Sequence, residues 1–541
     1  MDPIVRQVGQ HIEYEPEWES AFNLHIKLSA VITLIIDWCS SDSVVLIKAY
    51  RMLLVQLGEE STEDMKRRYI RELLDHSVSC IEYDVSSAPV SIHLPLSRLI
   101  AGLTLQLQKF NLDYNSYEFN VKNKPTPEEL MEPVLRTQVL IAQVYAGMWR
   151  RNGFFINSQV YYYHNVRCRQ EMLDRDIMLL QITANLIDSN KFLIHLLNRF
   201  SLMNWAQDDY ESNYLRGTDD DNMKQTVILA EEYLHLILTL VSERFTPGIG
   251  NVTEEERVKK EIIQFLCVEP MPHSLLSKAL PAGTNNETGM EKVIDEVAVF
   301  KKPLATAKGL FELKKEYYSQ YNLFFYHYTK EEQSKSEVAQ RARKKAANET
   351  ECCPPPIPPP FTKHFDLLIN ILQCDVFLYL VMTVLKRLAK PQSLSVSEAQ
   401  LQITLHLIGY ALHEEERYQK SEDISFNFTQ KAKNVNLLGQ LEALVDNPRT
   451  STHKDLLIWV INRFHEIIQL KGEASTRPKV FRTPQSSSSS NSGTSLSTTD
   501  ERKRKAELAK QRRERIMAKM SNMQNNFIKT NEVLFKVNKL G

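Results

Sequence analysis

Apolar residues recur three or four positions apart through much of residues 1–250, as at Leu24 and Leu28. This spacing puts them on one face of a helix, and such faces are buried when helices pack against each other. Two breaks rich in turn-forming residues, 113–127 and 208–222, predict surface loops between the helices. The pattern therefore predicts a multi-helix scaffold over residues 1–250.

The order of elements changes between residues 254 and 322. The third of three helical segments has capping-box spacing, since the Thr288 hydroxyl can accept from the amide of Glu291 while the Glu291 side chain reaches back. Three helices followed by an alternating hairpin are the element order of a winged helix, so we expect an embedded winged-helix module over residues 254–322. The segments that carry this prediction are 261–267, 273–280, 288–297 and 301–314.

Residues 323–362 join a charged helical segment to a run of prolines. Proline cannot continue a helix, so the run predicts an extended spacer and a domain boundary. Amphipathic helices resume over residues 363–472, where Ser397 and Gln400 have capping-box spacing. These residues are predicted to form a second helical bundle.

The last part of the chain is polar and then strongly basic. Residues 473–500 are a serine-rich, low-complexity segment, which predicts a disordered linker. Residues 501–541 hold 12 basic and four acidic residues, a net charge of +8, with no internal glycine or proline. They are predicted to form a long C-terminal basic amphipathic helix. Its apolar residues define one line along the helix, here called the apolar seam: Ile516, Met520, Met523, Phe527 and Leu534.

Composition narrows the class of protein. The 541 residues suffice for several domains, and only 16 glycines favour helices over turn-rich sheets. Lysine plus arginine number 66 against 67 acidic residues, which excludes a chain whose overall charge attracts nucleic acid or membrane. Seven scattered cysteines without a Cys-X-X-Cys pair indicate a reducing compartment. We expect a soluble, cytoplasmic protein, with no membrane partner and no signal peptide.

Catalytic signatures are absent from the sequence. It contains no Walker loop, dinucleotide-binding glycine motif, nucleophile elbow or zinc-protease motif, so no catalytic or cofactor-binding residue is predicted. His164 and Cys168 are four residues apart and could face one metal on a helix. Structural zinc needs four ligands, so we interpret the two as packing residues and predict no metal site.

The charge of the third helix indicates whether the winged helix could bind DNA. A recognition helix approaches phosphates and should be basic, whereas the third helix carries Glu291, Asp295 and Glu296 against Lys292 alone. This charge favours a protein-binding or purely architectural module. Nucleic acid is not an expected partner of it.

The basic terminal segment has three interpretations. Its charges could form a solvated face, with residues 502–505 acting as a nuclear localisation signal that adds the nucleus to the cytoplasm. They could also bind RNA or a membrane surface. Methionine and phenylalanine along the seam are adaptable apolar contacts suited to the groove of a partner, so partner docking is the interpretation we favour.

Five long strings of the chain are distinctive: DPIVRQVGQHIEYEPEW (residues 2–18), AQVYAGMWRRNG (142–153), YYYHNVRCR (161–169), TGMEKVIDEVAVFKK (288–302) and KRKAELAKQRRERIMAKM (503–520). They resemble the central region of the UBR-box N-recognin family of E3 ubiquitin ligases. The resemblance runs over nearly the whole length of the chain.

This resemblance implies a ligase that binds destabilising N-terminal residues through a zinc-binding UBR box and recruits a ubiquitin-conjugating enzyme beside a zinc RING. The chain lacks the cysteine and histidine spacing of both zinc modules, so zinc and substrate binding are expected only in family domains outside it, and we expect an internal fragment or truncated product. The resemblance further implies that residues 501–536 contact the conjugating enzyme. The residues predicted for this contact are Ile516, Met520, Met523, Phe527, Arg512, Arg513, Arg515 and Lys519.

Together these inferences predict the scaffold portion of a RING-type E3 ubiquitin transferase of the N-degron pathway. The chain itself would carry no catalytic site. The alternative, from another class, is a nucleic-acid-associated scaffold that uses the winged helix and the basic helix without an enzymatic role.

Overall fold

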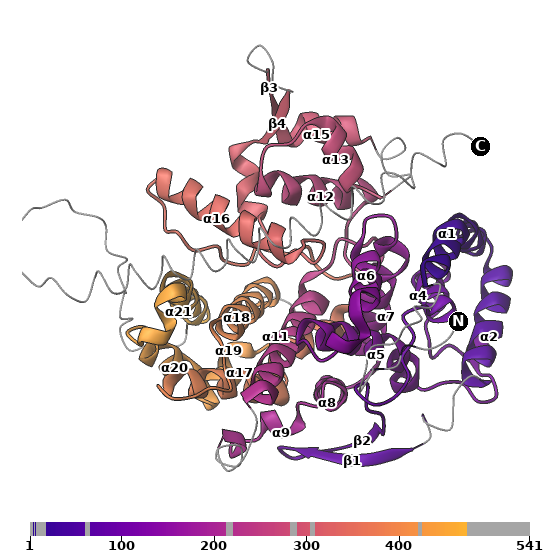
Figure 1. Ribbon diagram of the computed structural model, residues 1–541, viewed down its shortest axis with the longest axis horizontal. Coiled ribbons are helices and arrows are strands. Elements are labelled where there is room, and N and C mark those ends of the chain that lie inside the picture. Colours follow the sequence, from indigo (N-terminus) through magenta and orange to yellow (C-terminus); the bar gives the residue numbers. More distant parts are fainter. Residues whose placement is uncertain are drawn as a thin grey trace, which may run out of the picture. The chain divides into compact units, whose positions relative to one another are not determined.

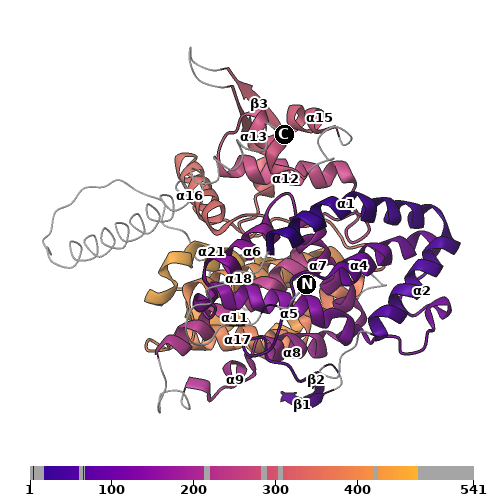
Figure 2. The same cartoon turned by 45° about the vertical axis from the view of Figure 1, so that its right-hand side comes forward.

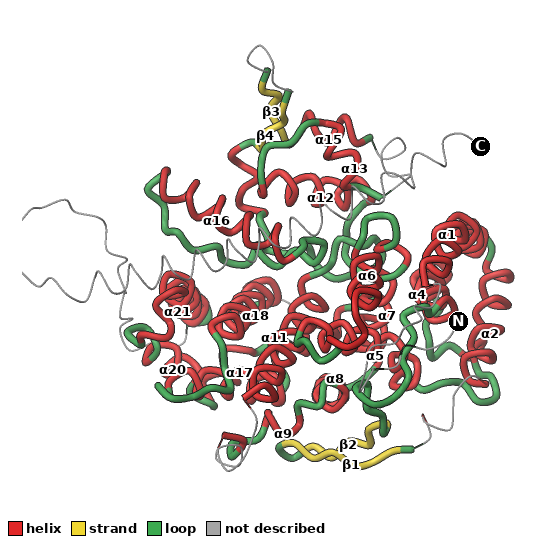
Figure 3. The backbone as a smooth tube through the Cα atoms, in the orientation of Figure 1, coloured by secondary structure: helices red, strands yellow, loops and turns green. Residues whose placement is uncertain are grey.

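The structure is a computed structural model that describes residues 4, 6, 18–59, 65, 67–211, 220–281, 289–302, 309–419 and 425–472. Helices dominate these residues, so the predicted mainly α fold is confirmed (Figure 1, Figure 3). Residues 473–541, with all eight predicted partner-binding residues, lie outside the described residues. The serine-rich linker and the terminal basic helix therefore stay predictions.

The first part of the chain is a run of helices that buried polar side chains tie together. In α4 the Arg98 guanidinium donates to both carboxylate oxygens of Asp176 in α7, at 2.8 and 2.9 Å. The Gln181 amide of α7 donates to the carbonyls of Leu240 and Glu243 at the end of α11. The elements are α1 (Trp18–Ser41), α2 (Ser43–Glu59), β1 (Arg68–Leu73), β2 (His76–Ile81), α4 (Pro95–Leu107), α5 (Pro127–Tyr145), α6 (Gly153–His164), α7 (Leu173–Leu186), α8 (Ser189–Arg199), α9 (Met203–Ala206) and α11 (Asp220–Ser242).

The strands β1 and β2 correct the prediction that the ordered elements of residues 1–250 are all helices. They pair antiparallel, with Tyr69 opposite Cys80 and Leu73 opposite His76. A two-residue turn joins them, in which Leu74 has a φ of 53°. Hairpin turns usually carry glycine or asparagine at a position with positive φ. Because leucine occupies that position, the sequence carries no hairpin signal there.

The winged-helix prediction is confirmed. Helices α12 (Glu254–Val268), α13 (His273–Ala279) and α15 (Met290–Val297) gather with the antiparallel strands β3 (Ala298–Lys301) and β4 (Leu310–Leu313) in both views (Figure 1, Figure 2). The predicted capping box of the third helix is wrong. Gly289 stands at the N-cap with a φ of 70°, and the Glu291 carboxylate bonds to His273 at 3.0 Å instead. Thr288 lies outside the described residues.

The proline run after α16 (Lys330–Ala346) is not helical, as predicted, but it is not a free spacer. Its carbonyls accept hydrogen bonds from the folded helices: Pro355 from His413 at 3.1 Å and Pro359 from Arg244 at 3.2 Å. The prolines therefore pack against α18 (Glu398–Tyr418). The domain limits drawn at residues 250 and 362 stay predictions.

The second group of helices follows the proline run (Figure 2). The side-chain oxygen of Ser397 accepts the amide of Gln400 at 3.1 Å, so the predicted cap of α18 is confirmed, although the Gln400 side chain bonds to Val227 rather than completing the box. The elements are the 3-10 helix η6 (Asp366–Gln373), α17 (Asp375–Ala389), α18, α19 (Phe428–Asn434), α20 (Leu437–Ala443), the 3-10 helix η7 (Pro448–His453) and α21 (Lys454–Leu470).

Helix α1 is long and apolar enough to match a membrane-spanning helix, and the bent pair η6 and α17 matches when taken together. The core helix of a soluble protein and a signal sequence near the N-terminus pass the same test, and η6 and α17 are largely buried in the fold. Length and composition therefore assign no membrane here. Apolar side chains on α1 are nevertheless exposed, among them Leu34 and Trp38 at 68% and 62%.

Candidate functional site: a buried charged junction

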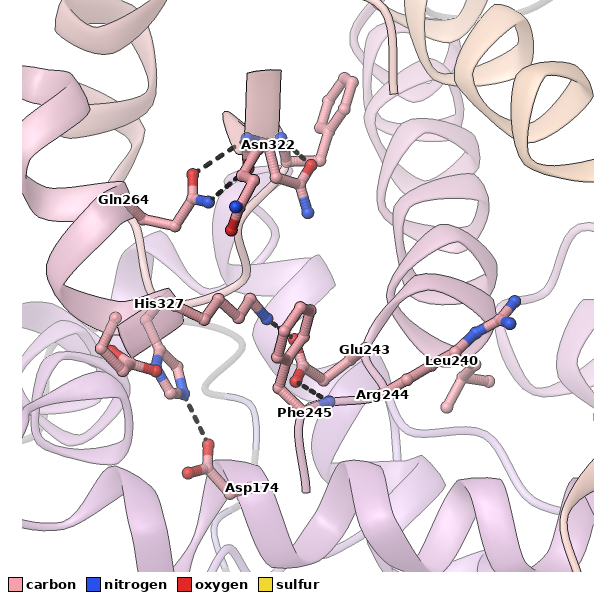
Figure 4. Close-up of polar contacts among 12 residues, drawn as sticks. Asp174, Leu240, Glu243, Arg244, Phe245, Gln264, Asn322 and His327 are labelled. Atoms are coloured by element: carbon pink, nitrogen blue, oxygen red, sulfur yellow. Dashed lines mark hydrogen bonds and ion pairs between the residues drawn. The ribbon is translucent and has the colours of Figure 1, made fainter. Parts of the chain in front are cut away.

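Four charged residues from four parts of the chain meet where the winged helix contacts the first helices. We call this cluster the His327 junction: His327 from the segment before α16, Glu261 of α12, Asp174 of α7 and Arg169 just ahead of α7. His327 Nδ1 lies 2.7 Å from Glu261 Oε1, and His327 Nε2 lies 2.7 Å from Asp174 Oδ1 (Figure 4). The imidazole is 4% exposed and thus bridges two carboxylates out of contact with water.

The pKa values at the junction follow from this geometry. Burial and the nearby Arg169 oppose a charged imidazole, but the Glu261 and Asp174 carboxylates outweigh them and raise the pKa of His327 above 6.5. Burial opposes the Glu261 carboxylate, and His327 and Arg169 overcome it, lowering its pKa to about 2. The pKa of Asp174 is lowered in the same way, against burial, by His327. Imidazolium and carboxylates therefore stabilise each other as charges.

Arg169 extends the junction to the second helix of the winged module. Its Nη2 donates to Glu261 Oε2 at 3.1 Å and to the carbonyl of Ala279, at the end of α13, at 2.9 Å. Both the first and the second helix of the winged module are thereby held by one guanidinium that belongs to the helical scaffold.

A second buried ion pair lies beside the junction. Lys260 of α12 donates to Glu243 at the end of α11, and the other oxygen of Glu243 accepts the amide of Phe245 at 3.1 Å (Figure 4). The Lys260 ammonium also lies 4.6 Å from the centre of the Phe245 ring and 5.0 Å from that of Phe325. Both the charge and the stem of this lysine are therefore fixed between scaffold and winged helix.

The chain that leaves the wing is held by one amide side chain. Gln264 of α12 donates from Nε2 to the carbonyl of Gln320 at 2.8 Å and accepts the amide of Asn322 at 2.9 Å (Figure 4). A side-chain amide that pairs with the backbone in both directions acts as a short stretch of sheet. Gln264 thereby fixes the course of the chain at Gln320 and Asn322, which leads on to His327.

Arg244, just beyond α11, connects the scaffold to the second group of helices. Its Nη1 lies 2.9 Å from Glu414 Oε1 of α18, and both side chains are fully buried. The guanidinium also stacks on the ring of Phe361, 3.9 Å from its centre. Breaking a buried pair of this kind by removing one partner costs about 3–5 kcal/mol.

The junction holds elements in place and is not built for catalysis. A histidine that serves as a general base needs one ring nitrogen facing a substrate, and carboxylates occupy both nitrogens of His327. Within the described residues no cluster of histidine, cysteine and acidic side chains has the arrangement of a metal site. What the arrangement can do is fix the orientation of the winged helix on the helices.

The residues singled out from the sequence are placed as follows. His164 Nδ1 lies 2.9 Å from the carbonyl of Val160, one turn earlier in α6, and the thiol of Cys168 is buried. On α15 the exposed side chains are Glu291, Lys292, Asp295 and Glu296, so the outer face of the third helix is acidic, as the sequence predicts.

The His327 junction has no signal in the sequence. Glu261 and Asp174, the partners of His327, lie 66 and 153 residues away from it along the chain, so no local spacing of residues could have indicated the cluster.

The described residues form an array of helices with an embedded winged helix, joined through buried ion pairs. Residues 1–236 match the family model described as the UBR1/2/3-like ARM repeat domain, and residues 257–355 match the winged-helix domain of UBR1-like E3 ubiquitin-protein ligases. The chain belongs to this UBR1/2/3-like family, which confirms the resemblance found in the sequence.

Curated relatives match nearly the whole chain. It is 44% identical to E3 ubiquitin-protein ligase UBR1 of Drosophila melanogaster and to UBR2 of Mus musculus, in each case over 99% of this chain and 30% and 31% of the relative. It is 40% identical to human UBR1 over 99% of this chain and 31% of that protein. The chain therefore spans about a third of the length of these relatives.

Proposed function

We propose that this chain is the scaffold portion of an E3 ubiquitin-protein ligase of the N-degron pathway, acting in the cytoplasm. The observation that carries the proposal is the extent of the likeness, 99% of the chain, to proteins named E3 ubiquitin-protein ligases. Substrates would be recognised by family domains outside this chain. Within the chain we assign no catalytic residue and no cofactor.

The proposed role is to fix distance. In ligation of the RING type the reactive thioester belongs to the conjugating enzyme, and the ligase contributes the proximity between that thioester and a substrate lysine. Fixing the geometry of two reactants can supply several kcal/mol of the activation barrier. A rigid connection such as the His327 junction supports this role, because a loose scaffold would forfeit that gain.

We assign the contact with the conjugating enzyme to the basic segment 501–541. Its apolar seam, with Ile516, Met520, Met523 and Phe527, would fill a groove, while Arg512, Arg513, Arg515 and Lys519 would steer the helix to an acidic surface. The acidic outer face of α15 supports a protein partner over nucleic acid for the winged helix.

Binding of the full chain to a panel of purified ubiquitin-conjugating enzymes tests this assignment at physiological salt. Met520→Ala with Phe527→Ala should weaken binding of one enzyme at least about tenfold, a loss of 1.4 kcal/mol. Met517→Ala with Ile528→Ala is the matched control, since the helical period places both residues off the seam. Equal affinity of both variants, or duplex RNA and DNA binding in place of the enzyme, would overturn the assignment.

A further inference from the structure

The hairpin β1–β2 has one edge that no strand covers. The amide of Glu82 donates to the carbonyl of Arg67 at 2.8 Å, so these two residues form a hydrogen-bonded pair of the antiparallel ladder. Because such pairs occur at every second residue, Tyr69 and Arg71 also form hydrogen-bonded pairs with β2. In an antiparallel pair the intervening residues turn their backbone N–H and C=O groups away from the partner strand. In β1 these outward groups belong to Arg68, Ile70 and Glu72, and within the described residues the sheet has two strands.

A cavity of about 860 Å³ lies beside this strand. Arg67, Tyr69, Ile70 and Arg71 line it from β1, and Asn198 of α8 and Met203 of α9 line it from the helices. Ligand sites typically enclose about 300–1,000 Å³ and combine apolar surface with a few oriented polar groups. The volume suits a few residues of an extended chain.

The polar groups of this cavity are arranged around one fixed guanidinium. Arg71 Nε donates to Asn198 Oδ1 at 2.9 Å, the Tyr69 hydroxyl donates to the same oxygen at 2.8 Å, and the guanidinium stacks 4.1 Å from the centre of the Tyr69 ring. Asn198 is 6% exposed, so the anchor is buried. The two terminal nitrogens of Arg71 have no partner among the described residues.

Charge along the strand indicates where an acid would bind. Arg68, on the other face, is already paired with Glu129 at 3.0 Å. Glu82 and Asp84 line the cavity at the Arg67 end, and Asp84 accepts hydrogen bonds from Ser86 and Ser87. Arg71 lies away from these two acids along the strand, so it is the primary site for an incoming carboxylate.

We propose that β1 and this cavity bind an extended acidic peptide segment as a third strand of the sheet. The outward backbone groups of β1 supply the main-chain hydrogen bonds, and Arg71, with Arg67 beside it, takes a carboxylate of the peptide. Ile70, which also lines the cavity and is 59% exposed, offers an apolar contact. Charged side chains also protect strand edges from pairing, but a charge that served only to repel strands would need no buried anchor such as Asn198.

The test is fluorescence polarisation with the full chain and a fluorescein-labelled peptide of three glutamate–valine repeats. A peptide of three lysine–valine repeats serves as the ligand control. Arg71→Ala should weaken binding of the acidic peptide at least about tenfold, whereas Arg68→Ala, on the other face of the same strand, should leave it within about twofold.

The edge itself is tested by Ile70→Pro, which removes an outward N–H without touching the pairing to β2. Ile70→Val keeps that N–H and is the matched control. We expect Ile70→Pro to abolish binding, and we expect the bound peptide to slow hydrogen exchange at the amides of Arg68, Ile70 and Glu72. No saturable binding of the acidic peptide, or binding that survives both Arg71→Ala and Ile70→Pro, would overturn the proposal.

Discussion

Replacing His327 by alanine is the sharpest test of the junction. The imidazole makes two charge-assisted contacts of 2.7 Å in a buried site. Without it, the Asp174 and Glu261 carboxylates, 13% and 10% exposed, face the single guanidinium of Arg169. The winged-helix module then loses the contact of His327 with Asp174 of α7, and the site keeps an excess of negative charge.

Two routes give the size of the effect. Removing one partner of a buried ion pair costs about 3–5 kcal/mol. The variant can limit this loss by protonating Glu261, whose ordinary pKa is 4.5, and at pH 7 that protonation costs about 3.4 kcal/mol. Both routes place the loss of stability at the junction at about 3–5 kcal/mol.

Native-state hydrogen exchange measures this loss locally, which matters because a chain with several packed parts need not unfold in one step. Amides of α12 should exchange at least about 100-fold faster in His327→Ala, while amides of α21 should keep their rates. His273→Ala is the matched control in the same module, because the His273–Glu291 pair is 45% and 78% exposed and exposed pairs contribute about 0–1 kcal/mol. Unchanged exchange in α12, or equal acceleration in α21, would refute the reasoning.

Two further outcomes follow from the same structure. Because folding raises the pKa of His327, the contribution of His327 to stability is complete below pH 6.5 and should fall by about 1.4 kcal/mol per pH unit as the pH rises toward the folded pKa. Folding lowers the pKa of Glu261, so a second loss of stability should occur as the pH falls from 4.5 toward 2. Exchange rates in α12 at several pH values measure both losses of stability. A rate of opening that does not depend on pH would contradict the coupling between these protonations and folding. Gly409→Ala in α18 should destabilise the chain by about 1–2 kcal/mol, because the new Cβ would lie 2.5 Å from Cγ of the rigid Pro355 ring and overpacking outweighs the helix preference of alanine. A thermal unfolding midpoint at or above that of the wild type would show that the proline run can move away.

Much of the fold could be predicted from the sequence because its signals are local. Helical periodicity, the Ser397 cap and the order of elements in the winged helix all depend on residues within a few positions of each other. The β1–β2 hairpin could not be predicted from the sequence, because Leu74 occupies the turn position where glycine or asparagine would have indicated a hairpin.

The junction could not be predicted, and the reason is physical. Charged residues are assumed to be solvated unless a partner is known, and the partners of His327 lie 66 and 153 residues away. The proline run is not helical, as predicted, but its packing depends on the contacts of Pro355 and Pro359 with distant residues. Composition alone carries no information on such contacts.

We propose that this chain acts as the scaffold portion of an E3 ubiquitin ligase. The most direct measurement exchanges it for the matching region of Drosophila melanogaster UBR1, to which it is 44% identical, and follows ubiquitin transfer by the chimera to a substrate with a destabilising N-terminal residue. We expect the chimera to transfer ubiquitin at a rate close to that of the unmodified relative, and more slowly with His327→Ala at unchanged affinity for the conjugating enzyme. A folded chimera that binds the conjugating enzyme but transfers no ubiquitin would contradict it.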